Sequence, residues 1–300
     1  MLKIAWSPVY RYELPKGHRF PMSKYDLLPE QLLYEGTVDN ENFFTPEKLE
    51  DKQIILTHTE DYLQKLNTQT LTAKEIRNIG FPMSPNLVTR GKHIANGTWM
   101  ATKFAIKNGI AMNIAGGTHH AYADHGEGFC LFNDIAIAAN LLKSKEPGFK
   151  ILIIDLDVHQ GNGTAKIFEN NNDIFTLSVH GEKNYPLRKE KSDLDIALPD
   201  GTDDKLYMNT LQKFIPPLIE KIQPNFIFYL AGVDVLGTDT LGRLNLTKIG
   251  CKERDKYILN IAKSNNIPVA VSMGGGYSPK LTDIIEAHAN TFRVAQEIFF

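Results

Sequence analysis

Two carboxylates and one imidazole occupy alternate positions in the segment ILIIDLDVHQGNGT, residues 151–164. In extended backbone, alternate side chains point to the same face, so Asp155, Asp157 and His159 converge without help from distant parts of the chain. Carboxylate oxygen and imidazole nitrogen suit a divalent transition metal such as zinc, which at catalytic sites keeps one position open for water. A simpler interpretation is that the aspartates only cap the helix introduced by Gly161, since short motifs often occur without a metal.

Further acid–base groups lie in two glycine-rich segments, GGTHH at residues 116–120 and GGGY at residues 274–277. His119 and His120 can serve as general base and acid near neutral pH if a second group orients each ring. Tyr277 can donate its hydroxyl to the oxyanion of a tetrahedral intermediate. With a metal held by Asp157, His159 and a third carboxylate from the loop of residues 234–239, these groups form an apparatus for hydrolysing an amide.

These residues need a scaffold that brings distant segments together. Short apolar runs alternate with helical patterns, which is typical of a parallel α/β sheet. We expect strands at residues 3–6, 54–57, 109–115, 151–154, 174–179, 226–230 and 269–273, and helices at residues 26–35, 59–66, 86–108, 134–144, 202–222, 247–264 and 280–300.

Polar residues follow five of these predicted strands. They are His119 and His120, Asp155 to His159, Ser178 and His180, Asp234 and Asp239, and Tyr277. Ligands bind at the carboxyl ends of parallel strands, so the sequence predicts one site at this edge of the sheet.

Other segments have simpler interpretations. His18, Arg19 and Lys24 lie in a predicted loop from which they could reach a site, but a place at the surface is the simpler expectation. Residues 184–195 are expected to form a solvated loop. The helix over residues 202–222 is expected to be interrupted near Pro216 and Pro217.

Composition narrows the class of protein. Apolar residues make up 42% and charged residues 23% of 300 residues, and the net charge of −2 gives no reason to expect binding to nucleic acid or an anionic membrane. Cys130 and Cys251 lie in separate segments and predict no disulfide. Neither a basic-apolar leader nor a membrane-length apolar run is apparent, so we expect a cytoplasmic protein.

Five ordered motifs, GGTHHA, GFCLFND, DLDVHQGNGT, AGVDVLGTDTLG and GGGY, resemble those of the zinc-dependent histone deacetylase family. The resemblance covers nearly the whole chain and is closest to the class IV branch and its bacterial members, judged by VDVLGTDTLGRL and the short GGGY turn. It implies the arginase/deacetylase fold, with residues 1–300 as a single α/β domain. Its central parallel sheet would have about eight strands between helical layers.

The resemblance also implies metal sites. Its zinc ligands correspond to Asp157, His159 and Asp239, and iron(II) is a possible substitute in the cell. A structural potassium ion would be held largely by backbone carbonyls of Asp155, Asp157, His159, Ser178 and Val179.

Catalytic and substrate-binding roles carry over in the same way. His119 corresponds to a buried electrostatic histidine paired with Asp155, His120 to a general base and acid paired with Asn162, and Tyr277 to the residue that polarises the acyl carbonyl. The residues implied at the acyl-lysine tunnel and around it are Phe129, Gly128, Tyr185, Leu241 and Gly275.

Two departures from the class I pattern concern the same site. Asn162 stands where class I members have aspartate, so the partner of His120 is neutral. The loop of residues 184–195 lacks the usual glycine-rich pattern, which affects the tunnel rim and therefore substrate choice.

Three alternatives to an acyl-lysine deacylase differ in substrate or activity. An arginase-type hydrolase needs a carboxylate two residues after His159, where this chain has Gly161. An acetylpolyamine amidohydrolase stays open, although Thr240 and Leu241 supply no gatekeeping glutamate after Asp239. A silent acyl-lysine-binding protein would need neither His120 nor Tyr277. The expected partner is an acyl-lysine protein or peptide, or a small acylated amine.

Overall fold

A single sheet of eight parallel strands forms the centre of the protein in the computed structural model, which describes residues 1–300. The strands are β1 Lys3–Ala5, β2 Phe43–Phe44, β3 Ile110–Asn113, β4 Ile151–Asp155, β5 Ile174–Gly181, β6 Leu194–Leu198, β7 Phe226–Gly232 and β8 Val269–Gly274. They lie in the order β2-β1-β3-β8-β7-β4-β5-β6, and every pair is parallel. The prediction of a parallel sheet of eight strands is confirmed.

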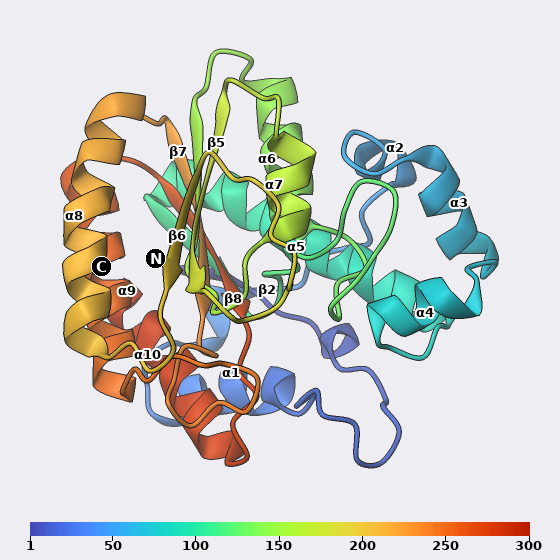
Figure 1. Ribbon diagram of the computed structural model, residues 1–300, viewed down its shortest axis with the longest axis horizontal. Coiled ribbons are helices and arrows are strands. Elements are labelled where there is room, and N and C mark those ends of the chain that lie inside the picture. Colours follow the sequence, from blue (N-terminus) through green and yellow to red (C-terminus); the bar gives the residue numbers. More distant parts are fainter.

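Helices cover both faces of this sheet (Figure 1). They are α1 Lys24–Tyr34, α2 Asp51–Ile54, α3 Glu60–Thr68, α4 Ala73–Ile79, α5 Pro85–Asn108, α6 Asp134–Lys145, α7 Asn162–Phe168, α8 Asp204–Ile222, α9 Lys248–Ser264 and α10 Leu281–Phe299. Helices α5 and α6 pack together on one face, while α8, α9 and α10 lie on the other, and α1 packs against α10. The short helices α2 to α4 extend to one side of this arrangement.

The central strands are apolar on both faces, as strands between two helical layers must be. All residues of β3, β4, β7 and β8 are buried, and their large apolar side chains belong to one continuous core of 80 residues. None of the helices combines the length and the apolar character that crossing a lipid bilayer requires.

Capping signals place several helix ends as predicted. The Thr59 side chain accepts a hydrogen bond from the Tyr62 amide at the start of α3, and Thr247 does the same for Gly250 at the start of α9. Gly109 ends α5 with φ 87°, a left-handed conformation that glycine adopts without strain.

The prediction of a strand at residues 54–57 is wrong. Ile54 is the last residue of α2, whose start is stabilised by reciprocal hydrogen bonds between Glu50 and Gln53. Ile55 and Leu56 are 38% and 50% exposed, so this apolar run is not buried on two faces. The second strand is instead β2, which lies at the edge of the sheet.

Two further predictions about elements are wrong. Helix α8 continues through Pro216 and Pro217, because both prolines lie on its exposed face, where water can reach the carbonyls left without an amide donor. Ser178 and His180 lie inside β5 and not beyond it, and the end of the expected loop of residues 184–195 begins strand β6.

Candidate active site

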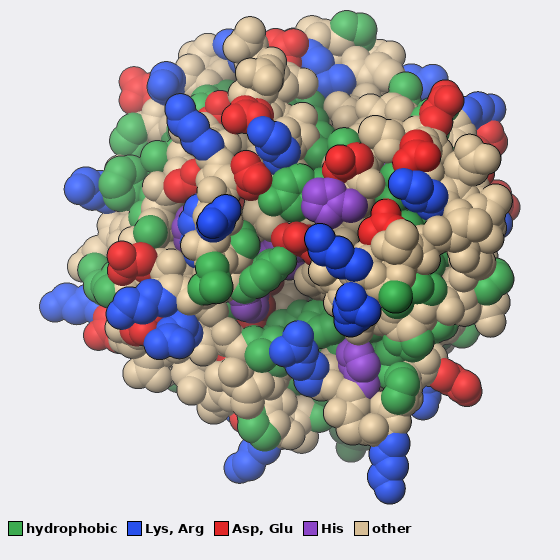
Figure 2. Space-filling view, turned by 45° about the vertical axis from the view of Figure 1, so that its right-hand side comes forward, with side chains coloured by type: hydrophobic (Ala, Val, Ile, Leu, Met, Phe, Trp, Pro, Cys, Tyr) green, Lys and Arg blue, Asp and Glu red, His purple; other side chains and the backbone are tan.

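The carboxyl ends of the central strands open onto a hollow in the protein surface. Figure 2 shows this face hollowed near its middle, with hydrophobic, basic and histidine side chains around the hollow. An outer cavity of about 430 Å³ leads toward His120 and His159. A more enclosed inner cavity of about 40 Å³ lies among His119, Asp157 and Tyr277. The predicted site at this edge of the sheet therefore coincides with a cavity.

Three buried side chains in this cavity form a group able to hold a metal ion. They are Asp157 and His159, directly after β4, and Asp234, two residues after β7. One ligand atom from each lies within 4.8 Å of the others. Strands β4 and β7 are direct neighbours, which brings the two loops together.

The close approach of these loops requires glycine. A Cβ at Gly232 would lie 2.6 Å from the Cα of Asp157, and one at Gly275 would lie 2.3 Å from the Asp234 carboxyl carbon. Gly275, expected among the substrate-binding residues, therefore packs directly on a metal-ligand candidate.

The structure brings Asp234 into this group, while the assignment of Asp239 as the third ligand stays a prediction. Both oxygens of Asp239 accept backbone hydrogen bonds: one accepts them from the amides of Leu241 and Gly242, and the other accepts one from the Tyr277 amide at 2.6 Å. Asp239 therefore ties its own loop to the turn that carries Tyr277, while Asp234 lies beside His159 at 3.2 Å.

The charge on this group favours a cation. Burial raises the pKa of Asp234 to about 7, and the nearby Asp157 carboxylate adds to the shift. Burial alone lowers the pKa of His159, but hydrogen bonds to Asp157 and Asp234 outweigh it and raise that pKa to about 10. Two buried carboxylates that attract a proton onto His159 would equally attract a divalent metal, so the donor set fits such an ion.

The two adjacent histidines each have the predicted partner. His119 Nδ1 lies 2.6 Å from an oxygen of Asp155, and His120 Nδ1 lies 2.6 Å from the amide oxygen of Asn162. A Cβ at Gly128 would lie 2.6 Å from the His120 ring, so this position also requires glycine.

The environments of the two histidines shift their pKa values in opposite directions. Burial lowers the pKa of His119, but the Asp155 and Asp157 carboxylates outweigh it and raise that pKa to about 9. Burial, together with the charges of His119 and His159, lowers the pKa of His120 well below its ordinary value. The surroundings therefore favour the protonated form of His119 and the neutral form of His120.

The start of α6 holds the histidine loop in place. Asn133 Nδ2 donates to the carbonyls of His119 and Ala121, and the Asp134 carboxylate accepts from the backbone amide and hydroxyl of Thr118. These contacts explain the ND pair of the motif GFCLFND, to which the sequence assigned no role beyond starting a helix.

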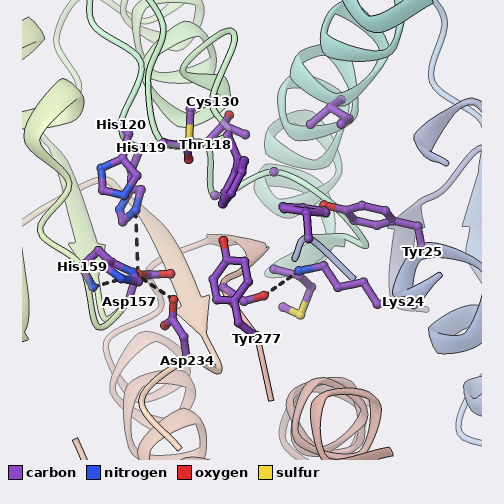
Figure 3. Close-up of a pocket in the computed structure, with 18 of the residues that line it drawn as sticks. Lys24, Tyr25, Thr118, His119, His120, Cys130, Asp157, His159, Asp234 and Tyr277 are labelled. Atoms are coloured by element: carbon purple, nitrogen blue, oxygen red, sulfur yellow. Dashed lines mark hydrogen bonds and ion pairs between the residues drawn. The ribbon is translucent and has the colours of Figure 1, made fainter. Parts of the chain in front are cut away.

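Tyr277 lies on the opposite side of the inner cavity from the histidines. Figure 3 shows its hydroxyl pointing into the cavity. Its ring packs against those of Phe20 and Phe129, each with centroids 6.1 Å away, so the tyrosine has an aromatic support. Burial raises the pKa of Tyr277 well above its ordinary value, which keeps the hydroxyl protonated as a donor.

The outer cavity contains the expected rim residues. Phe129 and Gly128 lie on one side, and Tyr185, 42% exposed, packs edge-on against His120 with centroids 5.0 Å apart. Asn184 donates to the Leu241 carbonyl at 2.7 Å, which connects two rim loops.

Three of the residues expected at a potassium site lie side by side in the sheet, and the other two, Asp157 and His159, follow β4. Asp155 pairs with Ser178 across β4 and β5, and Val179 follows in the same strand. The Ser178 hydroxyl lies 3.0 Å from His180 Nδ1.

Lys24 lines the inner cavity, although the sequence interpretation favoured a place at the surface. It begins α1, is only 4% exposed, and donates from Nζ to the Gly275 carbonyl at 2.5 Å (Figure 3). Burial lowers its pKa to about 8. The expectation of a surface loop residue is wrong because the start of α1 packs inward beside the GGGY turn, a tertiary contact that the local pattern does not reveal.

Arg254 on α9 is a second residue without a sequence signal. Its side chain is fully buried and donates to the carbonyls of Gly232 and Leu156 at 2.6 and 3.2 Å. One guanidinium group thus joins the two loops that carry the metal-ligand candidates.

Fold and site together define a hydrolase of the arginase/deacetylase fold. The histone deacetylase domain model matches residues 18–292, and the chain belongs to this family. It is an enzyme of the deacetylase type, as the family and its homologues establish.

Three related proteins align with most of this chain. An uncharacterised protein of Picosynechococcus is 38% identical over 99% of both chains. Histone deacetylase 2 of Arabidopsis thaliana is 29% identical over 91% of this chain and 73% of its own. The acetoin utilization protein AcuC of Staphylococcus aureus is 28% identical over 89% of this chain and 75% of its own.

Solved structures agree in fold. The HD domain of HDA15 superposes with a TM-score of 0.83 at 21% identity, covering 99% of this chain and 88% of that one. A histone deacetylase homologue from Aquifex aeolicus gives 0.81 at 25% identity, covering 97% and 82%.

Proposed function

We propose that this deacetylase hydrolyses the amide bond of N-acyl-lysine in proteins or peptides. The carrying observation is that a buried Asp–His–Asp group, two oriented histidines and a tyrosine hydroxyl surround one cavity. A structural neighbour has been solved in complex with SAHA. We assign residues 1–300 to one deacetylase domain, since they share one sheet and one continuous core.

Asp157, His159 and Asp234 would hold the metal, with zinc as the expected ion and iron(II) compatible with the same donors. When bound, the metal supplies a Lewis acid that polarises the acyl oxygen and makes water a better nucleophile. Potassium would be held by the backbone around Asp155, Asp157, His159, Ser178 and Val179.

His120 moves the proton. The Asn162 amide oxygen can only accept, so the hydrogen bond at 2.6 Å places the imidazole proton on Nδ1 and leaves the Nε2 lone pair free. His120 takes a proton from the attacking water at Nε2 and returns it to the leaving lysine amine.

Tyr277 and His119 stabilise developing charge. The Tyr277 hydroxyl donates to the oxygen that becomes negative during attack. His119, kept protonated by Asp155, adds a fixed positive charge close to Asp157, from which its Nε2 lies 3.8 Å away. A protein that only binds acyl-lysine would need neither an oriented base nor this donor.

The outer cavity favours acyl-lysine over acetylated polyamine. Its lining includes the basic residues Arg19, Lys183 and Arg243 and no acidic residue. Asp200 pairs with Arg243 at 2.8 Å and approaches Lys183 at 3.8 Å, which leaves a net positive mouth. A polyamine carries its remaining positive charges into this mouth, whereas a peptide can present neutral or acidic neighbours. Acyl-lysine would pass between Phe129 and Tyr185, beside Gly128 and Leu241, toward the turn at Gly275.

A hydrolysis panel tests this proposal. Metal-replete protein is assayed with acetyl-, octanoyl- and myristoyl-lysine peptides and with acetylated polyamine, and a chelated sample is the control. The inner cavity, at about 40 Å³, is small, so acetyl should be preferred over the longer acyl groups.

Each outcome has a definite meaning. Chelator-sensitive turnover of a lysine peptide supports the proposal. Turnover of polyamine alone would move the function to small-molecule metabolism. Silence on every substrate with metal demonstrably bound would favour a binding protein.

A further inference from the structure

Glu127 lies beside the candidate site but was not among the predicted site residues. It begins a tight turn in which Gly128 and Phe129 both have positive φ, 57° and 67°, and the Cys130 amide donates to the Glu127 carbonyl. This turn sends Phe129 to the cavity wall and places the Glu127 carboxylate behind the histidine dyad, where Asn162 and Tyr185 contact it.

One oxygen of Glu127 accepts two hydrogen bonds. Asn162 Nδ2 donates to it at 2.5 Å, and the Tyr185 hydroxyl donates to it at 2.6 Å. Asn162 Nδ2 also lies 3.1 Å from the hydroxyl of Tyr122, which in turn donates to Glu190 at 3.2 Å.

This contact decides which way the Asn162 amide points. A carboxylate accepts but does not donate, so Asn162 must turn its NH₂ group toward Glu127 and its oxygen toward His120. With the amide reversed, the NH₂ group would face Nδ1, and the imidazole proton would move to Nε2. His120 would then have no lone pair for the substrate side.

We propose that Glu127 is a positioning residue that orients the Asn162 amide and thereby holds His120 in the tautomer that acts as a base. This inference rests on the proposed function and adds a residue to it. The negative charge that an aspartate at position 162 would place next to His120 lies here one residue further out, and it is transmitted through a polarised amide. The same carboxylate holds the hydroxyl of Tyr185 at the rim.

Exchanging carboxylate for amide tests this role. Glu127→Gln should lower kcat of the zinc-loaded enzyme by about tenfold or more, with KM and zinc content unchanged. The matched control is Glu190→Gln, the same exchange one hydrogen bond further from His120, for which kcat should stay within about twofold. Equal kcat in the wild type and in Glu127→Gln would overturn the proposal.

A paired exchange separates positioning from folding. Asn162→Asp alone places two carboxylates at hydrogen-bond distance and should be impaired by their repulsion. In the double variant E127Q/N162D, the carboxylate at position 162 faces His120, and the amide at position 127 donates a hydrogen bond to that carboxylate. Most of the lost kcat should therefore return. A purely structural Glu127 would give losses that accumulate in the double variant, and that result would refute the proposed role.

The tautomer of His120 can be measured without any enzymatic reaction. Nitrogen-15 NMR of the His120 ring in the zinc-loaded protein should show the proton on Nδ1 in the wild type and a mixture in Glu127→Gln. If the wild type hydrolyses no substrate while this difference is seen, the proposed function fails and the positioning role stands. An unchanged tautomer in Glu127→Gln would rule that role out.

Discussion

The floor and the mouth of the cavity use polar residues in opposite ways. At the floor, Asp157, His159 and Asp234 are buried, and their charges are crowded against one another. At the mouth, Arg19, Lys183 and Arg243 line an open cavity that water can reach. The buried charges at the floor therefore interact strongly at short range and destabilise the fold. The charges at the mouth interact weakly, and salt can screen them.

The largest expected effect concerns the third metal ligand. Asp234→Asn should lower metal affinity by about a hundredfold or more and remove activity, because a buried carboxylate ligand is lost. Asp239→Asn should keep the metal, since its carboxylate bonds only to backbone amides. Metal content after dialysis, measured by elemental analysis, distinguishes them. Metal loss in Asp239→Asn alone would assign the third ligand to Asp239.

The second largest effect is expected from removing the base His120 or the hydroxyl of Tyr277. His120→Ala and Tyr277→Phe should each lower turnover by about two orders of magnitude or more while the metal stays bound. Steady-state rates on an acetyl-lysine peptide, with metal content measured in parallel, test this. Near-normal turnover in either variant would refute its assigned role.

The variant Lys24→Met should show that buried charge at the floor of the cavity destabilises the fold. The Lys24 pKa of about 8 lies below the ordinary value of 10.5, so its burial penalty is full below pH 8 and fades as pH rises to 10.5. Lys24→Met also removes the hydrogen bond to the Gly275 carbonyl, but burying the ammonium costs more than that one bond contributes, so the free energy of unfolding should rise by about 1–3 kcal/mol at pH 7, and by less at pH 10. Denaturant unfolding at both pH values measures the difference.

Lys92 provides the control for this prediction. It is also buried, at 2% exposed, but its ammonium pairs with Asp51 at 2.5 Å and with Asn67 at 2.8 Å. Lys92→Met should destabilise the protein, because it leaves those partners without a donor. The same sign for both variants at pH 7 would contradict the account of Lys24.

The smallest effect is expected at the mouth. Arg19→Gln should lower KM for an acetylated polyamine by about two- to threefold at low salt, and the change should vanish at high salt. Arg243→Gln should do less, since Asp200 already pairs with Arg243 at 2.8 Å. A salt-independent effect of Arg19→Gln would mean that its packing on Phe129 matters more than its charge.

Local sequence patterns predicted the central strands well. The all-apolar runs of β4, β7 and β8 can be stable only between two helical layers, and the polar residues after them had to lie at one edge. The run at Ile54 misled because two of its apolar residues are exposed next to a capped helical turn.

For the site, the sequence by itself determined which side chains were available and which strand ends carried them. Asp157 and His159 converge because they alternate in extended backbone, a local property. Tertiary structure alone brought Asp234 beside His159 and held Asp239 against the turn that carries Tyr277, because both placements depend on contacts between loops. It also brought Lys24, Arg254 and Glu127 to the site, since helix packing and loop contacts between distant segments place them, and no local pattern encodes such contacts.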